Sequence, residues 1–183
     1  MTVAGSGDSA ILTTERLLLR RWREEDRVPF RRMNADARVM EFMPSLLAPE
    51  ESDALVERME RHFGERGFGL MAAELKEGGE FIGYVGLSVP GFDAPFTPAV
   101  EIGWRLAAEF WGRGLATEAA REVLRYGFEE VGLGSVVSFT VPENVRSRRV
   151  MEKIGMRLVG EFEHPRLPEG HPLRRHVLYR VER

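Results

Sequence analysis

The fold is decided by residues 100–131, which read VEIGWRLAAEFWGRGLATEAAREVLRYGFEEV. The first seven residues are predicted to form a strand. From Ala116 to Val131 the apolar residues are alternately three positions and one position apart, which predicts a helix with one buried face. Residues 136–141 are apolar and β-branched, as is typical of a strand buried on both faces. Strand, helix and strand in this order predict a parallel strand pair.

Outward from this unit, hydrophobic periodicity predicts a single α/β domain with a mixed sheet and the element order β-α-α-β-β-β-α-β-α-β-β. The other strands are expected at residues 16–22, 68–75, 81–87, 156–162 and 176–181, and the other helices near residues 24–33, 49–64 and 144–154. Residues 1–13 are small and polar and are expected to form a flexible lead, with the domain at residues 14–183.

Composition excludes several classes of function. The chain has 183 residues, 43% of them apolar, which suits one globular domain. It has no cysteine, so disulfides, thiolate metal sites and cysteine nucleophiles are excluded. No apolar run has the length of a membrane span or a signal peptide, and we expect a cytoplasmic protein that does not bind membranes.

The net charge of −3 is too mild to favour a nucleic-acid partner. It is unevenly distributed, because residues 144–183 carry a balance of +5 and residues 1–143 a balance of −8. A solvated arginine face and a site for anionic groups both explain the basic part.

The loop before the central helix favours a phosphate ligand. Gly112 and Gly114 allow the backbone to approach a ligand closely, and the helix start offers unpaired N–H groups. An ATP-binding P-loop is not indicated because no lysine lies nearby, and Thr117 stands where a dinucleotide-binding loop needs Gly or Ala. A tight turn into the helix is the structural alternative.

These residues resemble the GNAT superfamily of acetyl-CoA-dependent acetyltransferases, whose phosphate motif is Gln/Arg-x-x-Gly-x-Gly/Ala. Gly114 and Ala116 match its last two defined positions. Trp111 departs from its first, but a Trp-Gly-x-Gly form resembles the branch that includes the RimJ and RimL ribosomal-protein acetyltransferases. The resemblance continues in Thr14 to Arg20, Glu101 to Trp104, Thr117 to Ala119, Asn144 with Ser147, and Glu152 to Gly155.

The resemblance implies a GNAT fold whose central parallel strands splay apart to admit acetyl-CoA. It implies transfer of the acetyl group to a primary amine, on a protein N-terminus or a small molecule, by direct attack and without a metal. Residues that contact acetyl-CoA are then expected at Ile102, Gly103, Trp104, Trp111, Gly112, Arg113, Gly114, Leu115, Ala116, Thr117, Asn144 and Arg149. Arg146 and Arg148 are further candidates for the 3′-phosphate.

Two residues are predicted to transfer protons. Glu101 is the candidate general base, because its strand flanks the expected thioester, although an edge carboxylate paired with an arginine is the structural alternative. In many GNAT enzymes a tyrosine serves as the general acid, but Met151 stands at that position and has no proton to give. Ser147 resembles the serine with this role in RimL-like enzymes, and a first-turn serine is equally able to bond its own helix.

The remaining predictions concern the acceptor side of the site and the competing functions. The four histidines lack metal-ligand spacing and are expected on the surface or in packing contacts. The loop at residues 164–172 resembles the wall of the acceptor site, which Trp22, Phe42, Phe92 and Phe96 are candidates to line. The competing hypotheses are a non-catalytic acyl-CoA sensor of the same fold and an arginine-rich nucleic-acid binder, which the overall charge disfavours.

Overall fold

A computed structural model describes residues 10–183 and contains one eight-stranded sheet of order β1-β2-β3-β4-β5-β6-β8-β7. The strands are β1 (Leu12–Thr13), β2 (Leu17–Arg20), β3 (Leu70–Leu75), β4 (Phe81–Ser88), β5 (Glu101–Leu106), β6 (Ser135–Thr140), β7 (Arg157–Glu163) and β8 (Arg175–Glu182). The helices are α1 (Arg27–Asn34), α2 (Pro49–Arg66), α3 (Leu115–Glu129) and α4 (Val145–Lys153), with short 3₁₀ turns at Glu24–Asp26 and Ala108–Phe110. The predicted element order and the mixed sheet are confirmed.

One short strand differs from the sequence-based expectation. Leu12 and Thr13, at the end of the expected lead, form β1 and pair antiparallel with β2. Leu12 is buried in the main core, so burial of its side chain fixes this segment. The rest of the expected lead, residues 1–9, lies outside the described part of the chain.

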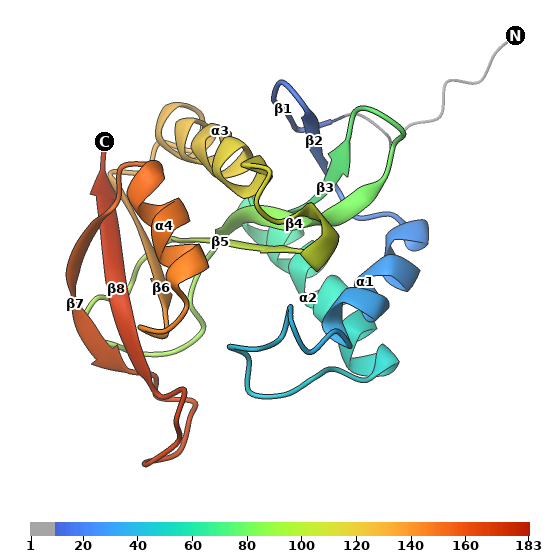
Figure 1. Cartoon of the computed structure of the whole chain (residues 1–183). Coiled ribbons are helices and arrows are strands. Elements are labelled where there is room, and N and C mark those ends of the chain that lie inside the picture. Colours follow the sequence, from blue (N-terminus) through green and yellow to red (C-terminus); the bar gives the residue numbers. More distant parts are fainter. Residues whose placement is uncertain (1–9) are drawn as a thin grey trace, which may run out of the picture.

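Helices cover both faces of the sheet (Figure 1). On one face α3 packs against β4 and β5, with Ala119, Ala120 and Val123 fully buried. On the opposite face α1 and α2 enclose a second core around Trp22 and Phe30. None of the helices within residues 10–183 is long and apolar enough to cross a membrane.

A buried ion cluster closes the edge of this second core. Arg20 is 3% exposed and donates hydrogen bonds to both carboxylate oxygens of Asp26, at 2.7 and 2.9 Å. It also bonds Glu74 at 2.7 Å, which ties β2 to β3 and to the start of α1. Alternation along β2 places Arg20 on the face opposite the apolar Leu17 and Leu19. Its pairing with two carboxylates allows this charged residue to be buried there.

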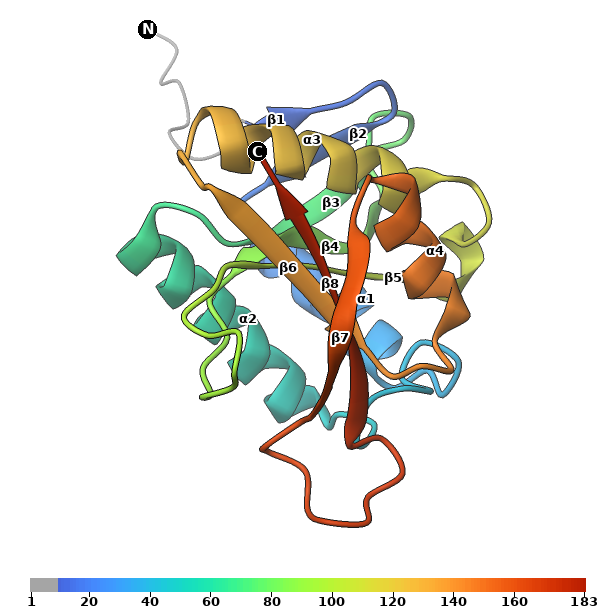
Figure 2. The same ribbon diagram turned by 90° about the vertical axis from the view of Figure 1, so that its left-hand side faces the viewer.

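The sheet divides between β5 and β6. They form the parallel pair, with Glu101 opposite Val137, but no further register pair follows. Figure 1 shows the two strands diverging, and Figure 2 shows β6, β8 and β7 turned relative to the strands behind them. The divergence leaves part of β5 without a neighbouring strand on its β6 side, whereas β4 pairs with its other side along the whole strand, as the resemblance predicted.

Candidate active site

The glycine loop delivers unpaired donors at the start of α3. Gly112 and Gly114 have φ values of +73° and +77°, in the left-handed region that favours glycine. The first hydrogen bond of the helix runs from the Glu118 N–H to the Gly114 carbonyl, and no side chain caps the helix. The N–H groups that precede this bond are therefore free to bind an anion.

Hydrogen bonds from the N-terminal segment hold the glycine loop in place. Glu118 accepts hydrogen bonds from the Thr14 hydroxyl at 2.6 Å and from Arg16 Nε at 2.7 Å. Arg16 also donates to the carbonyl of Arg113 at 3.0 Å. The resembling motifs at Thr14 to Arg20 and Thr117 to Ala119 thus meet in space and orient the glycine loop.

The edge of β5 that faces the divergence leaves backbone groups free for a ligand. Ala107 N–H bonds to Ile82 on β4, so by the alternation of antiparallel pairing the backbone groups of Ile102, Trp104 and Leu106 point toward the divergence. The Ile102 carbonyl accepts the Ser138 hydroxyl, and the Leu106 carbonyl accepts the Trp111 indole N–H, each at 2.9 Å. Within residues 10–183, the N–H and carbonyl of Trp104 have no partner across this edge.

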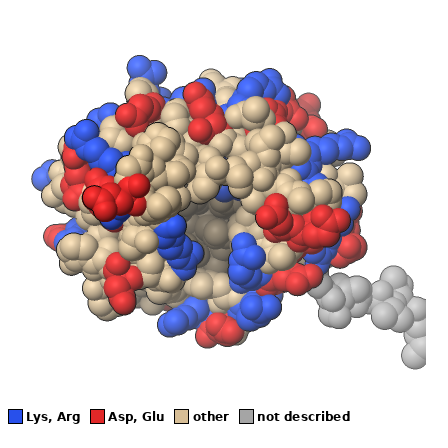
Figure 3. All heavy atoms as spheres, turned by 90° about the horizontal axis from the view of Figure 1, so that it is seen from below, with Lys and Arg blue, Asp and Glu red and all other residues tan. Residues whose placement is uncertain are grey.

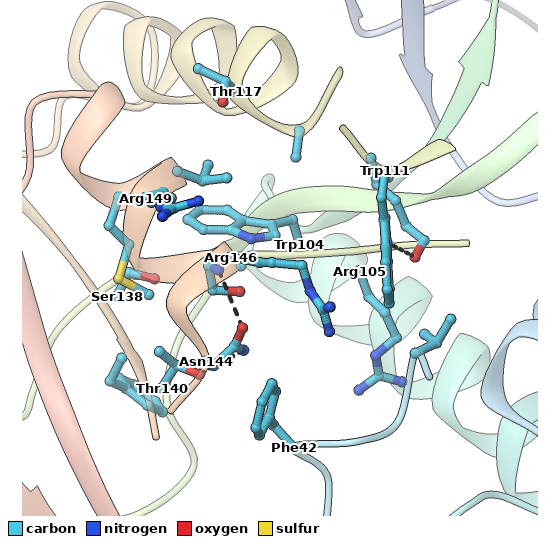
Figure 4. Close-up of a pocket in the computed structure, with 18 of the residues that line it drawn as sticks. Phe42, Trp104, Arg105, Trp111, Thr117, Ser138, Thr140, Asn144, Arg146 and Arg149 are labelled. Atoms are coloured by element: carbon cyan, nitrogen blue, oxygen red, sulfur yellow. Dashed lines mark hydrogen bonds between the residues drawn. The ribbon is translucent and has the colours of Figure 1, made fainter. Parts of the chain in front are cut away.

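The glycine loop, the free edge of β5 and the start of α4 border one pocket of about 560 Å³. Figure 3 shows a hollow in this face of the molecule with Lys and Arg side chains on two sides of its mouth. Figure 4 shows that Trp104 lies between Thr117 at the start of α3 and Asn144 before α4. The predicted site residues that line the pocket are Glu101, Gly103, Trp104, Trp111, Gly112, Gly114, Leu115, Ala116, Thr117, Asn144, Ser147 and Arg149.

Three predicted contact residues do not line this pocket. The Ile102 side chain is fully buried in the main core, so only its backbone faces the divergence. The Arg113 guanidinium lies over the Phe110 ring at 5.7 Å. Arg148 donates to the Tyr179 hydroxyl and the Pro142 carbonyl, so of the three candidates for the 3′-phosphate only Arg146 and Arg149 face the pocket.

Among the described residues, Glu101 is the only carboxylate that lines the pocket. Within residues 10–183 it forms no ion pair and no side-chain hydrogen bond, so the alternative of an edge carboxylate paired with an arginine is wrong. Burial raises the pKa of Glu101 to about 8, because the charged form loses hydration without gaining a partner. A carboxyl group with this pKa ionises near pH 8, and its carboxylate form is a stronger base than an ordinary carboxylate.

Asn144 and Ser147 lie in different environments at the start of α4. Asn144 Oδ1 accepts the backbone N–H of Ser147 at 3.2 Å, and its Nδ2 donates to Thr140 Oγ1 at 3.0 Å. Asn144 is therefore the N-cap of α4, as predicted. The Ser147 hydroxyl has no hydrogen-bond partner among the described residues and lies on the pocket.

Comparison with known proteins identifies this arrangement. A family model described as an acetyltransferase (GNAT) domain matches residues 16–157, which include the glycine loop, both diverging strands and α4. The chain belongs to the GNAT acetyltransferase family. Its N-acetyltransferase relatives include YnaD of Bacillus subtilis (strain 168), named as uncharacterized, which is 30% identical over 161 residues, 87% of this chain and 89% of YnaD.

Solved GNAT structures have the same architecture. The acetyltransferase from Agrobacterium tumefaciens str. C58 superposes with a TM-score of 0.77 at 28% identity, covering 100% of this chain and 99% of that one. The structure titled Mycobacterium smegmatis RimJ in complex with CoA-disulfide has a TM-score of 0.72 at 23% identity, covering 91% of this chain and 81% of that one. This second likeness supports the GNAT fold.

The pocket of this GNAT protein is also lined by two histidines, which the sequence analysis expected on the surface or in packing contacts. His164 and His176 line the pocket, with ring centroids 5.0 Å apart. Burial lowers the pKa of both, and for His164 the nearby His176 and Arg166 lower it further. His176 Nδ1 faces the Arg174 carbonyl at 3.1 Å, so the neutral ring donates there and leaves Nε2 without a proton.

An aromatic cluster supports these two rings. Phe139 lines the pocket and lies within 6.2 Å of His164 and 5.9 Å of His176, measured between ring centroids. Phe92 and Phe96 pack behind Phe139, each at 5.8 Å, and do not themselves line the pocket. This cluster joins the loop before β5 to β6, β7 and β8.

The prediction for Trp22 is wrong. Its ring lies 4.8 Å from that of Phe30 in the second core, and its indole N–H donates to the Leu70 carbonyl at 2.9 Å. Phe42 does line the pocket, from the loop between α1 and α2.

Proposed function

We propose that this GNAT protein transfers the acetyl group of acetyl-CoA to a primary amine by direct attack, as a member of a RimJ/RimL-like branch. The observation that carries the proposal is the shared pocket, in which a glycine loop with free N–H groups, an unpaired β5 edge and an unpaired carboxylate face one another. Such a pocket provides an anion site, a backbone edge and a proton acceptor within one cavity.

The residues fit acetyl-CoA in three places. The N–H groups at the start of α3 suit the pyrophosphate, and the cations Arg149 and Lys153 of α4 line the same pocket. The carbonyl of Trp104 offers an acceptor to an amide N–H of the pantetheine arm. When bound, acetyl-CoA supplies an activated acetyl group.

Glu101 is proposed as the general base. An amine attacks only in its neutral form, and Glu101 accepts the proton that the amine loses, directly or through water. A new C–N bond forms as the C–S bond breaks. The Trp104 N–H is the candidate donor to the oxygen that carries negative charge during the attack.

Ser147 is proposed as the general acid. Its hydroxyl faces the pocket without a protein partner, so it is able to give a proton to the departing thiolate and to recover one from water. Because the chain has no cysteine, the acetyl group does not pass through a cysteine-bound intermediate. The exclusion of this route favours direct transfer from acetyl-CoA to the amine.

The proposal is tested in two steps. Calorimetry with acetyl-CoA is expected to give saturable binding that Gly114→Glu weakens at least tenfold, because the substitution strains a left-handed backbone position and puts a negative charge beside the anion site. Release of free thiol with a panel of primary amines is expected to show transfer. Unchanged affinity in the Gly114 variant contradicts the site, and tight binding without transfer to any amine favours the acyl-CoA sensor.

A cytoplasmic location and a single domain over residues 14–183 remain predictions.

A further inference from the structure

The side of the pocket that faces α1 contains a cation without an acidic partner. Arg105 lies two residues beyond Gly103 and four beyond Glu101, so on a strand all three lie on the same face of β5. Arg105 and Glu101 both line the pocket. No carboxylate within residues 10–183 lies within ion-pair distance of Arg105, although the described chain is rich in arginine–carboxylate pairs.

Neutral groups hold the Arg105 guanidinium in place. Its Nη1 donates to Asn34 Oδ1 at 2.8 Å, and its Nη2 donates to Met43 Sδ at 3.1 Å. The Asn34 amide is fully buried and its Nδ2 donates to the hydroxyl of the equally buried Ser52 at 2.9 Å. This second bond turns Oδ1 toward Arg105, so a chain of hydrogen bonds from α2 through α1 orients the guanidinium.

The Arg105 guanidinium has N–H groups left with which to bind an anion. Of its five N–H groups, two are used by Asn34 and Met43, and the others have no hydrogen-bond partner among the described residues, while the guanidinium lies over the Tyr84 ring at 5.6 Å. Figure 4 shows the Arg105 side chain extending into the pocket on the side of Phe42. A guanidinium whose orientation is fixed by neutral partners keeps its full charge for a ligand and loses little conformational entropy on binding.

Space for such a ligand exists between Arg105 and Glu101. A Cβ placed on Gly103 meets no heavy atom within 4 Å, so the strand face between the two charged residues is open. The other cations that line the pocket, Arg146, Arg149 and Lys153, all come from α4. Of the pocket's cations, Arg105 alone shares the strand face that carries the candidate base.

We propose that the acceptor is an amine that also carries a carboxylate, and that Arg105 binds this carboxylate while the amine lies toward Glu101. The inference rests on the proposed function and specifies its acceptor class. The Arg105 guanidinium presents parallel N–H groups that match the two oxygens of a carboxylate. Asn34 is a positioning residue, because it orients Arg105 and does not line the pocket.

The test uses ω-amino acids of increasing chain length, each compared with its amino amide, which has the same amine but no negative charge. With the full chain and saturating acetyl-CoA, the acid of the best pair is expected to exceed its amide at least tenfold in kcat/KM. Arg105→Gln is expected to reduce this preference to less than threefold without changing the KM for acetyl-CoA. The exposed Arg61 of α2 provides the control variant Arg61→Gln, in which the preference is expected to persist.

The outcomes separate this inference from the proposed function. Equal turnover of acids and amides leaves the transferase intact and overturns the role of Arg105, as does a preference that survives Arg105→Gln. If acetyl-CoA binds but no amine is acetylated, calorimetry of the same acids and amides with the CoA-saturated chain decides the question. Tighter binding of the acids that depends on Arg105 then supports the anion site, and equal binding overturns it. Arg105→Lys retains the charge and controls for a loss of folding.

Discussion

The hydroxyl of Ser138 on β6 donates a hydrogen bond to the carbonyl of Ile102 on β5 at 2.9 Å. One residue pair earlier, a backbone bond joins Val137 N–H to the Val100 carbonyl, also at 2.9 Å. A side chain thus replaces the main chain at the point where the parallel pair ends. Beyond it the strands diverge and the Trp104 backbone is left for a ligand.

This bond is expected to stabilise the divergence. Ser138 is 3% exposed, so Ser138→Ala leaves the Ile102 carbonyl buried without a donor and should lower the free energy of unfolding by about 1–3 kcal/mol. Denaturant unfolding measures the change. Ser135→Ala removes an exposed hydroxyl from the same strand, and an equal effect in this control would contradict the assignment.

Glu101→Gln is expected to lower turnover at least tenfold, since a general base contributes about 10² to 10⁴ in rate. In the unsubstituted chain kcat/KM should rise with pH through the raised pKa of Glu101, about 8, because the carboxylate is the active form. The pH profile measures this limb, which the Gln variant should lack. Glu109→Gln, which removes an exposed carboxylate, is the control and should keep the pH profile of the unsubstituted chain. A pH profile that Glu101→Gln leaves unchanged would contradict the role of Glu101.

The raised pKa of Glu101 also predicts that the folded protein loses stability as the pH rises, whereas turnover increases. The folded protein retains the Glu101 proton up to about pH 8, whereas the unfolded chain loses it near pH 4.5. Stability therefore falls as the pH rises between these values. Glu101→Gln removes this loss, so at pH 9 the variant should be more stable than the unsubstituted chain by at least about 1 kcal/mol.

Ser147→Ala and Asn144→Ala should separate chemistry from helix capping. The Ser147 hydroxyl bonds no described residue, so its removal should lower turnover at least tenfold with little change in the melting temperature. Asn144 caps α4, so its removal should cost about 1 kcal/mol of folding free energy. Thermal unfolding and turnover measured on both variants provide the comparison. Loss of stability without loss of turnover in Ser147→Ala would leave that residue a structural role only.

Arg20→Gln is expected to destabilise the protein by about 3–5 kcal/mol, because it leaves two carboxylates, those of Asp26 and Glu74, buried without their main cation. Chemical denaturation measures the loss. Arg125 on α3 pairs with three carboxylates at the surface, and Arg125→Gln should leave the unfolding midpoint nearly unchanged because water screens those pairs. Similar losses in both variants would show that burial does not set the strength of these pairs.

Most of the fold followed from local patterns. The period of the apolar residues predicted α3, and the run at residues 136–141 predicted β6, because both depend only on neighbouring residues along the chain. The glycine loop was predicted for the same reason, since positive φ angles are a property of single residues. β1 was missed because a two-residue strand has too few positions to show a period.

The candidate site was predicted where a short motif marks its residues and was missed where only the packing of strands brings residues together. Gly114 and the start of α3 were identified from one short segment. His164 and His176 were not, because their place in the pocket depends on how β7 and β8 pair and pack against Phe139. Trp22 was misplaced because a strand-end aromatic fits a core and a pocket equally well.

The element order, the positive-φ glycine loop and the absence of any cysteine chemistry followed from the sequence alone, because periodicity, glycine geometry and composition are local properties. Only the tertiary structure decided that Glu101 is unpaired, that Ser138 ends the parallel pair, and that Asn34 orients Arg105. Asn34 and Arg105 stand 71 positions apart, and their contact depends on the packing of α1 against the sheet. Charge pairing and pocket shape arise from such packing, which no short segment specifies.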